Sequence, residues 1–142
     1  MVLGAALLLG AGLALVIDHF LVDTLVDDAT FVTLAGYPGD VRGPFLEYAG
    51  WVLLAIGLVV LVAAIARHQP IDARGFAGAL LFGGGVTWFG WTSFDMHVLE
   101  RYDWPEGTSE LVPDLLYHGS GLLVAVAGWL LLAPTIARLT AR

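Results

Sequence analysis

The chain has 142 residues, of which 58% are hydrophobic and only 13% are charged. Soluble domains are typically about 25% charged, so this composition and a mean hydropathy of +0.84 indicate that lipid is the main solvent. The absence of cysteine excludes disulfides, thiolate metal sites and thiol nucleophiles. With 6 basic and 13 acidic residues and a net charge of -7, the chain is not expected to bind nucleic acid. All basic residues are arginine, and a lysine-free, aspartate-rich composition is typical of a protein from a high-salt cytoplasm.

Four apolar runs follow one another along the chain, and each is long enough to cross a bilayer core of about 30 Å as a helix. They predict transmembrane helices at 2–22, 46–66, 75–99 and 115–137, which form a single membrane domain of residues 1–142. Charges lie near the ends of these runs. The predicted fold class is therefore all-α, an integral membrane four-helix bundle.

The arginines set the predicted orientation, because cytoplasmic loops of membrane proteins collect Lys and Arg. One side of the membrane would carry four arginines and the other side two: Arg67, Arg74, Arg138 and Arg142 against Arg42 and Arg101. We therefore expect a multi-pass protein of the cell membrane with both termini cytoplasmic. Loops 23–45 and 100–114 would then face outside.

Glycine is concentrated in the third predicted helix. Gly83, Gly84 and Gly85 are consecutive at mid-span. Consecutive glycines lower helix propensity, but they allow another helix backbone to approach closely. This pattern predicts that the third helix is central.

Polar residues that bind metals in other proteins gather near the outer ends of three predicted helices. The first helix carries Asp18 and His19, the third carries Asp95 and His97, and the fourth begins near His118. Ionisable residues inside a membrane span are costly and are functional by default. These five residues are the candidate metal ligands.

The spacing along each helix indicates which of these residues could face the same site. His19 and Asp23 are four residues apart, as are Asp114 and His118, so each pair shares a helix face. Asp95 and His97 are two apart, which separates them by about 200° around a regular helix. They would face one axial site only if the third helix ended or distorted there.

Short motifs in the first and third helices resemble those of a known family. Gly10, Gly12, Leu13 and Asp18 match parts of a Gly-x-Gly-Leu-Gly-Gly-x-x-Asp-Gly pattern, and Asp95-Met96-His97-Val98-Leu99 is similar to the start of an Asp-His-His-x-Leu-Gly-x-His-His motif. These patterns belong to the membrane proteins of the domain of unknown function 2243 family. The resemblance implies four spans and a His-rich outer site, with Asp18, Asp95 and His97 as the polar positions carried over. Several family histidines are replaced here, one of them by Asp23.

The leading functional hypothesis is a metal-handling membrane protein that holds Cu or Zn near its outer face. Imidazole suits both metals, and a carboxylate completes or orients such a site. His19, His97 and His118, with Asp18 or Asp95, would supply the ligands. The chain contains no hydrolase motif, so hydrolytic catalysis is not expected.

Two alternatives remain open from the sequence. In one, His19 and either His97 or His118 ligate a haem between helices of a redox subunit. In the other, the polar residues form an internal hydrogen-bond network in a non-catalytic assembly or structural subunit. The expected partners are the lipid bilayer and either other membrane subunits or further copies of the chain.

Overall fold

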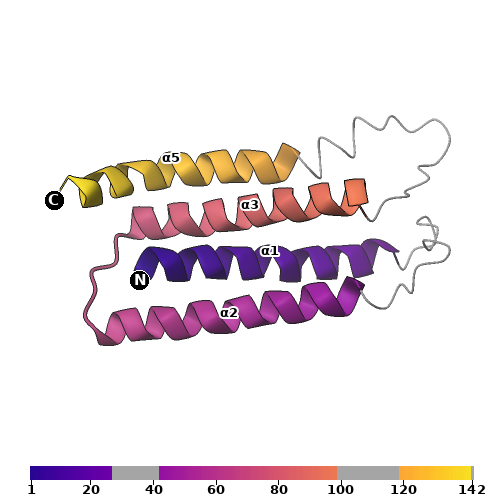
Figure 1. The fold of residues 1–142 in the computed structure, drawn as a ribbon, viewed down its shortest axis with the longest axis horizontal. Coiled ribbons are helices and arrows are strands. Elements are labelled where there is room, and N and C mark those ends of the chain that lie inside the picture. The colour runs from indigo at the N-terminus through magenta and orange to yellow at the C-terminus, as the bar shows by residue number, and fades with distance from the viewer. Residues whose placement is uncertain (27–41, 99–118, 142) are drawn as a thin grey trace.

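The computed structural model describes the backbone of residues 1–26, 42–98 and 119–141, and side chains at 1–18, 20, 48–93 and 119–141. This part of the chain is all helical, which confirms the predicted all-α class, and contains no strand. The helices are α1 (Val2–Val26), α2 (Arg42–Ala66), α3 (Ala73–Val98) and α5 (Ser120–Thr140) (Figure 1).

The helices extend beyond the apolar runs from which they were predicted. α1 continues to Val26, α2 begins at Arg42, and α5 continues to Thr140. A helix needs backbone hydrogen bonds and not an apolar sequence, so charged residues at the ends of a run do not stop it. The boundary between apolar and polar sequence therefore lies within the terminal turns.

The four helices lie in a row in the order α2, α1, α3, α5 (Figure 1). α1 and α3 are the inner pair and run in the same direction, and α2 and α5 run antiparallel to them at the two edges. Within the described residues, α5 contacts neither α1 nor α2, and α2 does not contact α3. The arrangement is thus an open row and not a closed bundle. The predicted central place of the third helix is confirmed, and α1 shares it.

Glycine forms the contact between the inner helices. A Cβ atom added at Gly84 would lie 3.1 Å from the carbonyl oxygen of Gly10, and one added at Gly10 would collide with the carbonyl of Leu80. One added at Gly83 would collide with the backbone of Leu7. The backbones of α1 and α3 therefore touch directly, as small residues permit in helix pairs in membranes.

The outer contacts are built in the same way. α5 packs on α3 where a Cβ at Gly85 would meet the backbone of Ala125 and one at Gly128 would meet that of Phe82. α2 packs on α1 where a Cβ at Gly12 would lie 2.8 Å from the carbonyl oxygen of Gly50. Each interface therefore contains glycine, and α1 and α3 each use glycine on two sides.

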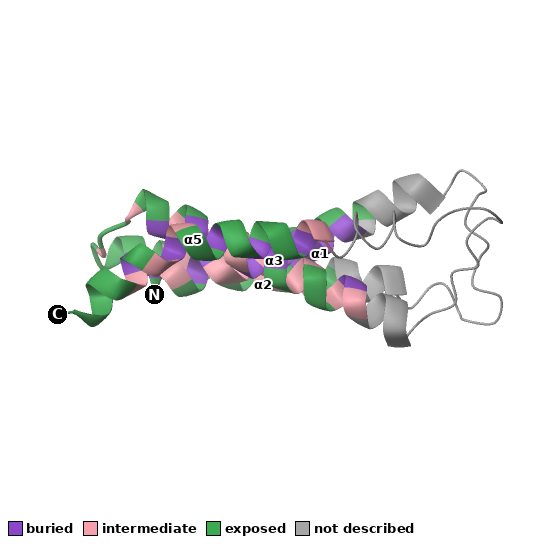
Figure 2. Cartoon of the chain, turned by 90° about the horizontal axis from the view of Figure 1, so that it is seen from above, coloured by how far each residue is buried: buried purple, intermediate pink, exposed green. Residues whose placement is uncertain are grey.

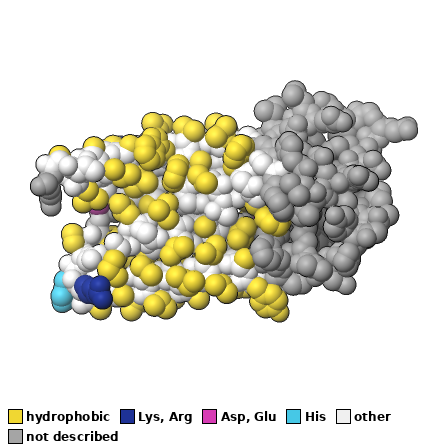
Figure 3. Space-filling model, viewed as in Figure 1, with side chains coloured by type: hydrophobic (Ala, Val, Ile, Leu, Met, Phe, Trp, Pro, Cys, Tyr) yellow, Lys and Arg dark blue, Asp and Glu magenta, His cyan; other side chains and the backbone are white. Residues whose placement is uncertain are grey.

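Small side chains predominate among the buried residues and large ones among the exposed residues, and Figure 2 shows where buried and exposed residues lie along the helices. Six of the ten buried hydrophobic residues are alanines. Large exposed apolar residues occur on every helix, and Figure 3 shows hydrophobic side chains across the described part of one face. They include Leu13, Ile17 and Phe20 of α1, Val52, Val59 and Val62 of α2, Val86 and Phe89 of α3, and Leu122, Leu123 and Leu130 of α5.

Two stretches have the length and apolar composition that crossing a bilayer requires, Tyr48–Ala66 and Ser120–Thr140. In α1 the apolar stretch is shorter and covers Val2–Asp18. These findings concern the described residues.

α2 ends in a left-handed turn. His68 has a φ of 51°, its N–H donates to the carbonyl of Ile65 at 2.8 Å, and the N–H of Gln69 donates to that of Ala64 at 3.0 Å. This pair of bonds defines a Schellman motif with His68 at the left-handed position, and Pro70 follows it. The chain then passes the start of α1 to reach α3 (Figure 1).

Candidate functional site

Asp18 is a buried carboxylate in the described part of α1. Only 3% of its surface is exposed, and its Oδ2 atom is sealed from solvent. Asp18 follows Leu7 by eleven residues, which is about three helical turns, and Leu7 packs on Gly83 of α3. The neighbouring residue Ile17 is 47% exposed. Asp18 therefore belongs to the side of α1 that faces the protein.

α3 places polar groups at the same depth. Gly10 and Gly84 mark one level of the inner helix pair, and eight residues further along each helix, about 12 Å, lie Asp18 and Thr92. Thr92 is 4% exposed, and its hydroxyl donates to the carbonyl of Trp88 at 2.8 Å. The Nε1 atom of Trp91 is also sealed from solvent. We call this region, defined by Asp18, Trp91 and Thr92, the polar end.

Asp95 and His97 lie on the last turn of α3. The helix continues to Val98, so the two positions are about 200° apart around it, and the distortion that would align them is not found in the backbone. Position 95 follows Gly84 by eleven residues, which is again about three turns. Position 95 is therefore about one helical turn further from the contact between α1 and α3 than Thr92, which is level with Asp18.

The remaining histidine candidates are placed less fully. Position 19 lies three residues after Val16, which packs on Gly50 of α2, and about 100° around α1 from Asp18. His118 lies outside the described residues, and so do the side chains of His19, Asp95 and His97. Among the side chains that the structure does describe, no three His, Asp or Glu come together.

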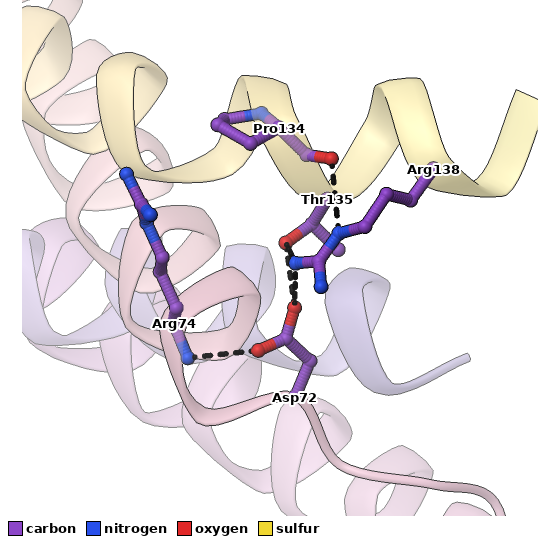
Figure 4. Close-up of polar contacts among 5 residues, drawn as sticks. All are labelled: Asp72, Arg74, Pro134, Thr135 and Arg138. Atoms are coloured by element: carbon purple, nitrogen blue, oxygen red, sulfur yellow. Dashed lines mark hydrogen bonds and ion pairs between the residues drawn. The ribbon is translucent and has the colours of Figure 1, made fainter.

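A second polar cluster, which sequence reasoning missed, lies at the opposite end of the row (Figure 4). Oδ2 of Asp72 accepts a hydrogen bond from the hydroxyl of Thr135 at 2.7 Å. The same oxygen forms an ion pair with Nη2 of Arg138 at 2.8 Å. Oδ1 accepts from the backbone N–H of Arg74 at 3.2 Å. Nε of Arg138 donates to the carbonyl of Pro134 at 3.2 Å. Asp72 thus joins the start of α3 to the end of α5.

These bonds favour the ionised form of Asp72. The hydroxyl of Thr135 is the largest influence that holds the pKa of the carboxyl below its ordinary value of 3.8, and backbone N–H groups and the Arg138 guanidinium act in the same direction. Asp72 precedes α3 directly, where an acidic residue is a common N-cap. The position of Asp72 directly before a helix could have predicted the N-cap from the sequence, but nothing in the sequence predicted its bond to Thr135.

The cluster belongs to what we call the arginine end, which contains Arg67, Arg74, Arg138 and both chain termini. Nη1 of Arg67 lies 3.4 Å from Sδ of Met1, which holds the end of α2 close to the start of α1. His68 is also exposed at this end. Arg and His side chains are visible at this end in Figure 3.

A scan against protein-family models, a search of curated proteins and a search of solved structures each found no match to this chain.

Proposed function

We propose that the chain is an integral membrane protein whose four helices all cross the bilayer. The observation that carries this proposal is the inverted distribution of side-chain size. Lipid removes the penalty for exposing Leu, Val and Phe, and helices in lipid associate through close packing of small residues. The glycine contacts of α1, α3 and α5 and the large apolar residues on the outside of all four helices fit that environment.

The arginine end is the proposed cytoplasmic side. It gathers Arg67, Arg74 and Arg138 beside both termini, and the positive-inside rule assigns such an end to the cytoplasm. The polar end, with Asp18, then faces outside. The predicted loops 23–45 and 100–114 are assigned to the same outer side, although 23–26 and 42–45 belong to α1 and α2 and the rest of both loops lies outside the described residues.

The absence of native cysteine makes this topology directly testable. A single cysteine at Gln69→Cys, in the connection between α2 and α3, should react with a membrane-impermeant maleimide only after the cells are opened. A matched Thr108→Cys variant in loop 100–114 should react in intact cells. Release of the protein from membranes by alkaline carbonate would contradict insertion, and reversed labelling would contradict the orientation alone.

For the role of this membrane protein, we propose that it handles a Cu or Zn ion at the polar end. The support is the buried Asp18 on α1, together with the parallel α3 that carries Asp95 and His97 beyond the same helix contact. Carboxylate and imidazole form a donor set suited to these metals. Asp18 and Asp95 would contribute oxygen donors, and His19, His97 and His118 would contribute nitrogen donors.

The close approach of the inner helices favours a small ion over a haem between them. Where Gly84 meets Gly10, about 12 Å from the polar end, not even a Cβ atom fits without displacement, so a porphyrin could not extend between α1 and α3 to that level. A hydrogen-bond network around Asp18 is the competing role that needs no ligand.

A metal inventory of the purified protein tests the proposed role. We expect about one Cu or Zn per chain, lost in Asp18→Asn and His97→Ala and retained in His68→Ala, which removes an exposed histidine at the opposite end. A wild-type protein without metal, whose Asp18→Asn variant only melts at lower temperature, would favour the network instead. A haem band in the absorption spectrum would favour the redox subunit.

A further inference from the structure

We infer that the arginine end binds the phosphate groups of anionic phospholipids, an inference that rests on the proposed membrane insertion. Arg67 follows the last residue of α2, Arg74 is the second residue of α3, and Arg138 lies in the last turn of α5. All three are exposed. Three helices therefore present guanidinium groups at one end of the row, at the depth where headgroups lie.

The charge at this end is not balanced by the protein. Asp72 is the one acidic residue in segments 1–17, 48–93 and 119–142, and its carboxylate is engaged by Arg138 and Thr135. Among the residues that the structure describes, Arg67 and Arg74 have no acidic partner. Figure 4 shows the side chain of Arg74 directed away from Asp72, to which only its backbone N–H donates. Two exposed guanidiniums are thus available to an anion.

Apolar surface adjoins these charges. Ile65 and Val62, which precede Arg67 in α2 and so lie on the membrane side of it, are 52% and 56% exposed. A phospholipid has the matching arrangement, with apolar acyl chains directly below a charged phosphate. The surface therefore fits a lipid headgroup better than an acidic protein, which would leave the apolar residues beside the arginines uncovered. Basic residues close to an anionic leaflet strengthen lipid binding by about fivefold each.

Native mass spectrometry of the full chain, released from nanodiscs that contain equal amounts of phosphatidylglycerol and phosphatidylcholine, tests the inference. We expect phosphatidylglycerol to be retained in excess and the excess to fall by about tenfold or more in the Arg67→Gln/Arg74→Gln variant. The Arg67→Lys/Arg74→Lys variant should keep most of it. A matched Arg42→Gln/Arg101→Gln variant removes two arginines from the other proposed side and should keep the full excess.

Equal retention of the two lipids by the wild type would overturn the inference, and so would an equal loss in both glutamine variants. The thermal stability of the protein in phosphatidylcholine nanodiscs with added inorganic phosphate distinguishes the source of the anion. Stabilisation by free phosphate that matches the effect of phosphatidylglycerol would overturn the assignment to lipid. Failure to enter nanodiscs at all would instead overturn the proposed membrane insertion.

Discussion

Single residues decide how the helices of this protein end and how they are joined. His68 adopts a left-handed backbone conformation that glycine usually occupies, and Asp72 begins α3 while it binds Thr135 and Arg138 of α5. Both residues lie between α2 and α3, so this short connection fixes the end of α2, the start of α3 and the end of α5. Its sequence contains turn formers and a cap, which local rules recognise, but a hydroxyl 63 residues away is outside the reach of such rules.

Replacement of His68 by glycine should stabilise the protein. A non-glycine residue at a left-handed position costs about 1–2 kcal/mol, and glycine recovers part of this against its own greater loss of backbone entropy. We expect a net gain of about 0.5 kcal/mol in the free energy of unfolding, measured in detergent by circular dichroism. Gln69→Gly, one residue later, serves as the control and should give no gain. A lower melting temperature for His68→Gly would contradict the role of the turn.

The link between Asp72 and α5 should depend on pH. Because the folded state lowers the pKa of Asp72 below 3.8, the carboxylate contributes stability that is fully present above the unfolded value. That contribution is lost as the pH falls through the lower folded value. Asp72→Asn should therefore melt at a lower temperature than the wild type at neutral pH, and the difference should shrink in acid.

Thr135→Val provides the matched test, since it removes the hydroxyl and keeps the shape of the side chain. It should raise the pKa of Asp72 and move the acid loss of stability to higher pH. An Asp72→Asn variant with the same pH dependence as the wild type would show that the link contributes nothing.

At the scale of helices, packing depends on where glycine faces a neighbour and not on apolar periodicity. All four helices are apolar around most of their circumference, so the sequence pattern does not tell which side of a helix is buried. The run at Gly83, Gly84 and Gly85 was the exception, because three adjacent glycines need a packing reason, and it predicted the inner place of α3. The pairing of α1 with both α2 and α3 could not be predicted, because Gly10 and Gly12 do not indicate which helix packs against each of them.

Gly10 and Gly90 give a matched pair of substitutions. A Cβ at Gly10 would collide with the carbonyl of Leu80, whereas one at Gly90 meets nothing within 4 Å. Gly10→Ala should separate α1 from α3 and destabilise the protein by about 1–3 kcal/mol. Gly90→Ala should be neutral or stabilising by up to about 1 kcal/mol, because alanine has the higher helix propensity.

Unfolding by a denaturing detergent, followed by tryptophan fluorescence, measures both variants on the same scale. If Gly90→Ala destabilised the protein as much as Gly10→Ala, the contact between α1 and α3 would not explain the effect.

At the scale of the whole molecule, the row consists of two hairpins. α1 pairs with α2, α3 pairs with α5, and the hairpins meet through the parallel inner helices (Figure 1). The number of helices followed from the apolar runs, whereas their order in a row did not. Asp18 lies inside the first apolar run, and it is buried. Which side of α1 is buried at Asp18 depends on the order of the helices, which did not follow from the sequence.

The two hairpins should assemble when they are made as separate chains. Division between Gln69 and Pro70 keeps every contact between α1 and α3, because these contacts lie within the helices. We expect the fragment that ends at Gln69 to copurify with a tagged fragment that begins at Pro70. Introduction of Gly10→Ala into the first fragment should reduce the yield of the pair. Copurification that does not respond to this change would place the assembly contact elsewhere.

A molecule built as a row allows its sequence to drift at most positions. Each inner helix is constrained on two narrow strips by the backbone of a neighbour, and each edge helix on one strip. In the proposed membrane setting, the remaining surface requires only that a residue be apolar. Over long divergence the large side chains of α2 and α5 can therefore exchange Leu, Val and Ile freely. The volume at Gly10, Gly84 and Gly128 must stay small. The positions that specify this fold are thus mainly those of its smallest residues.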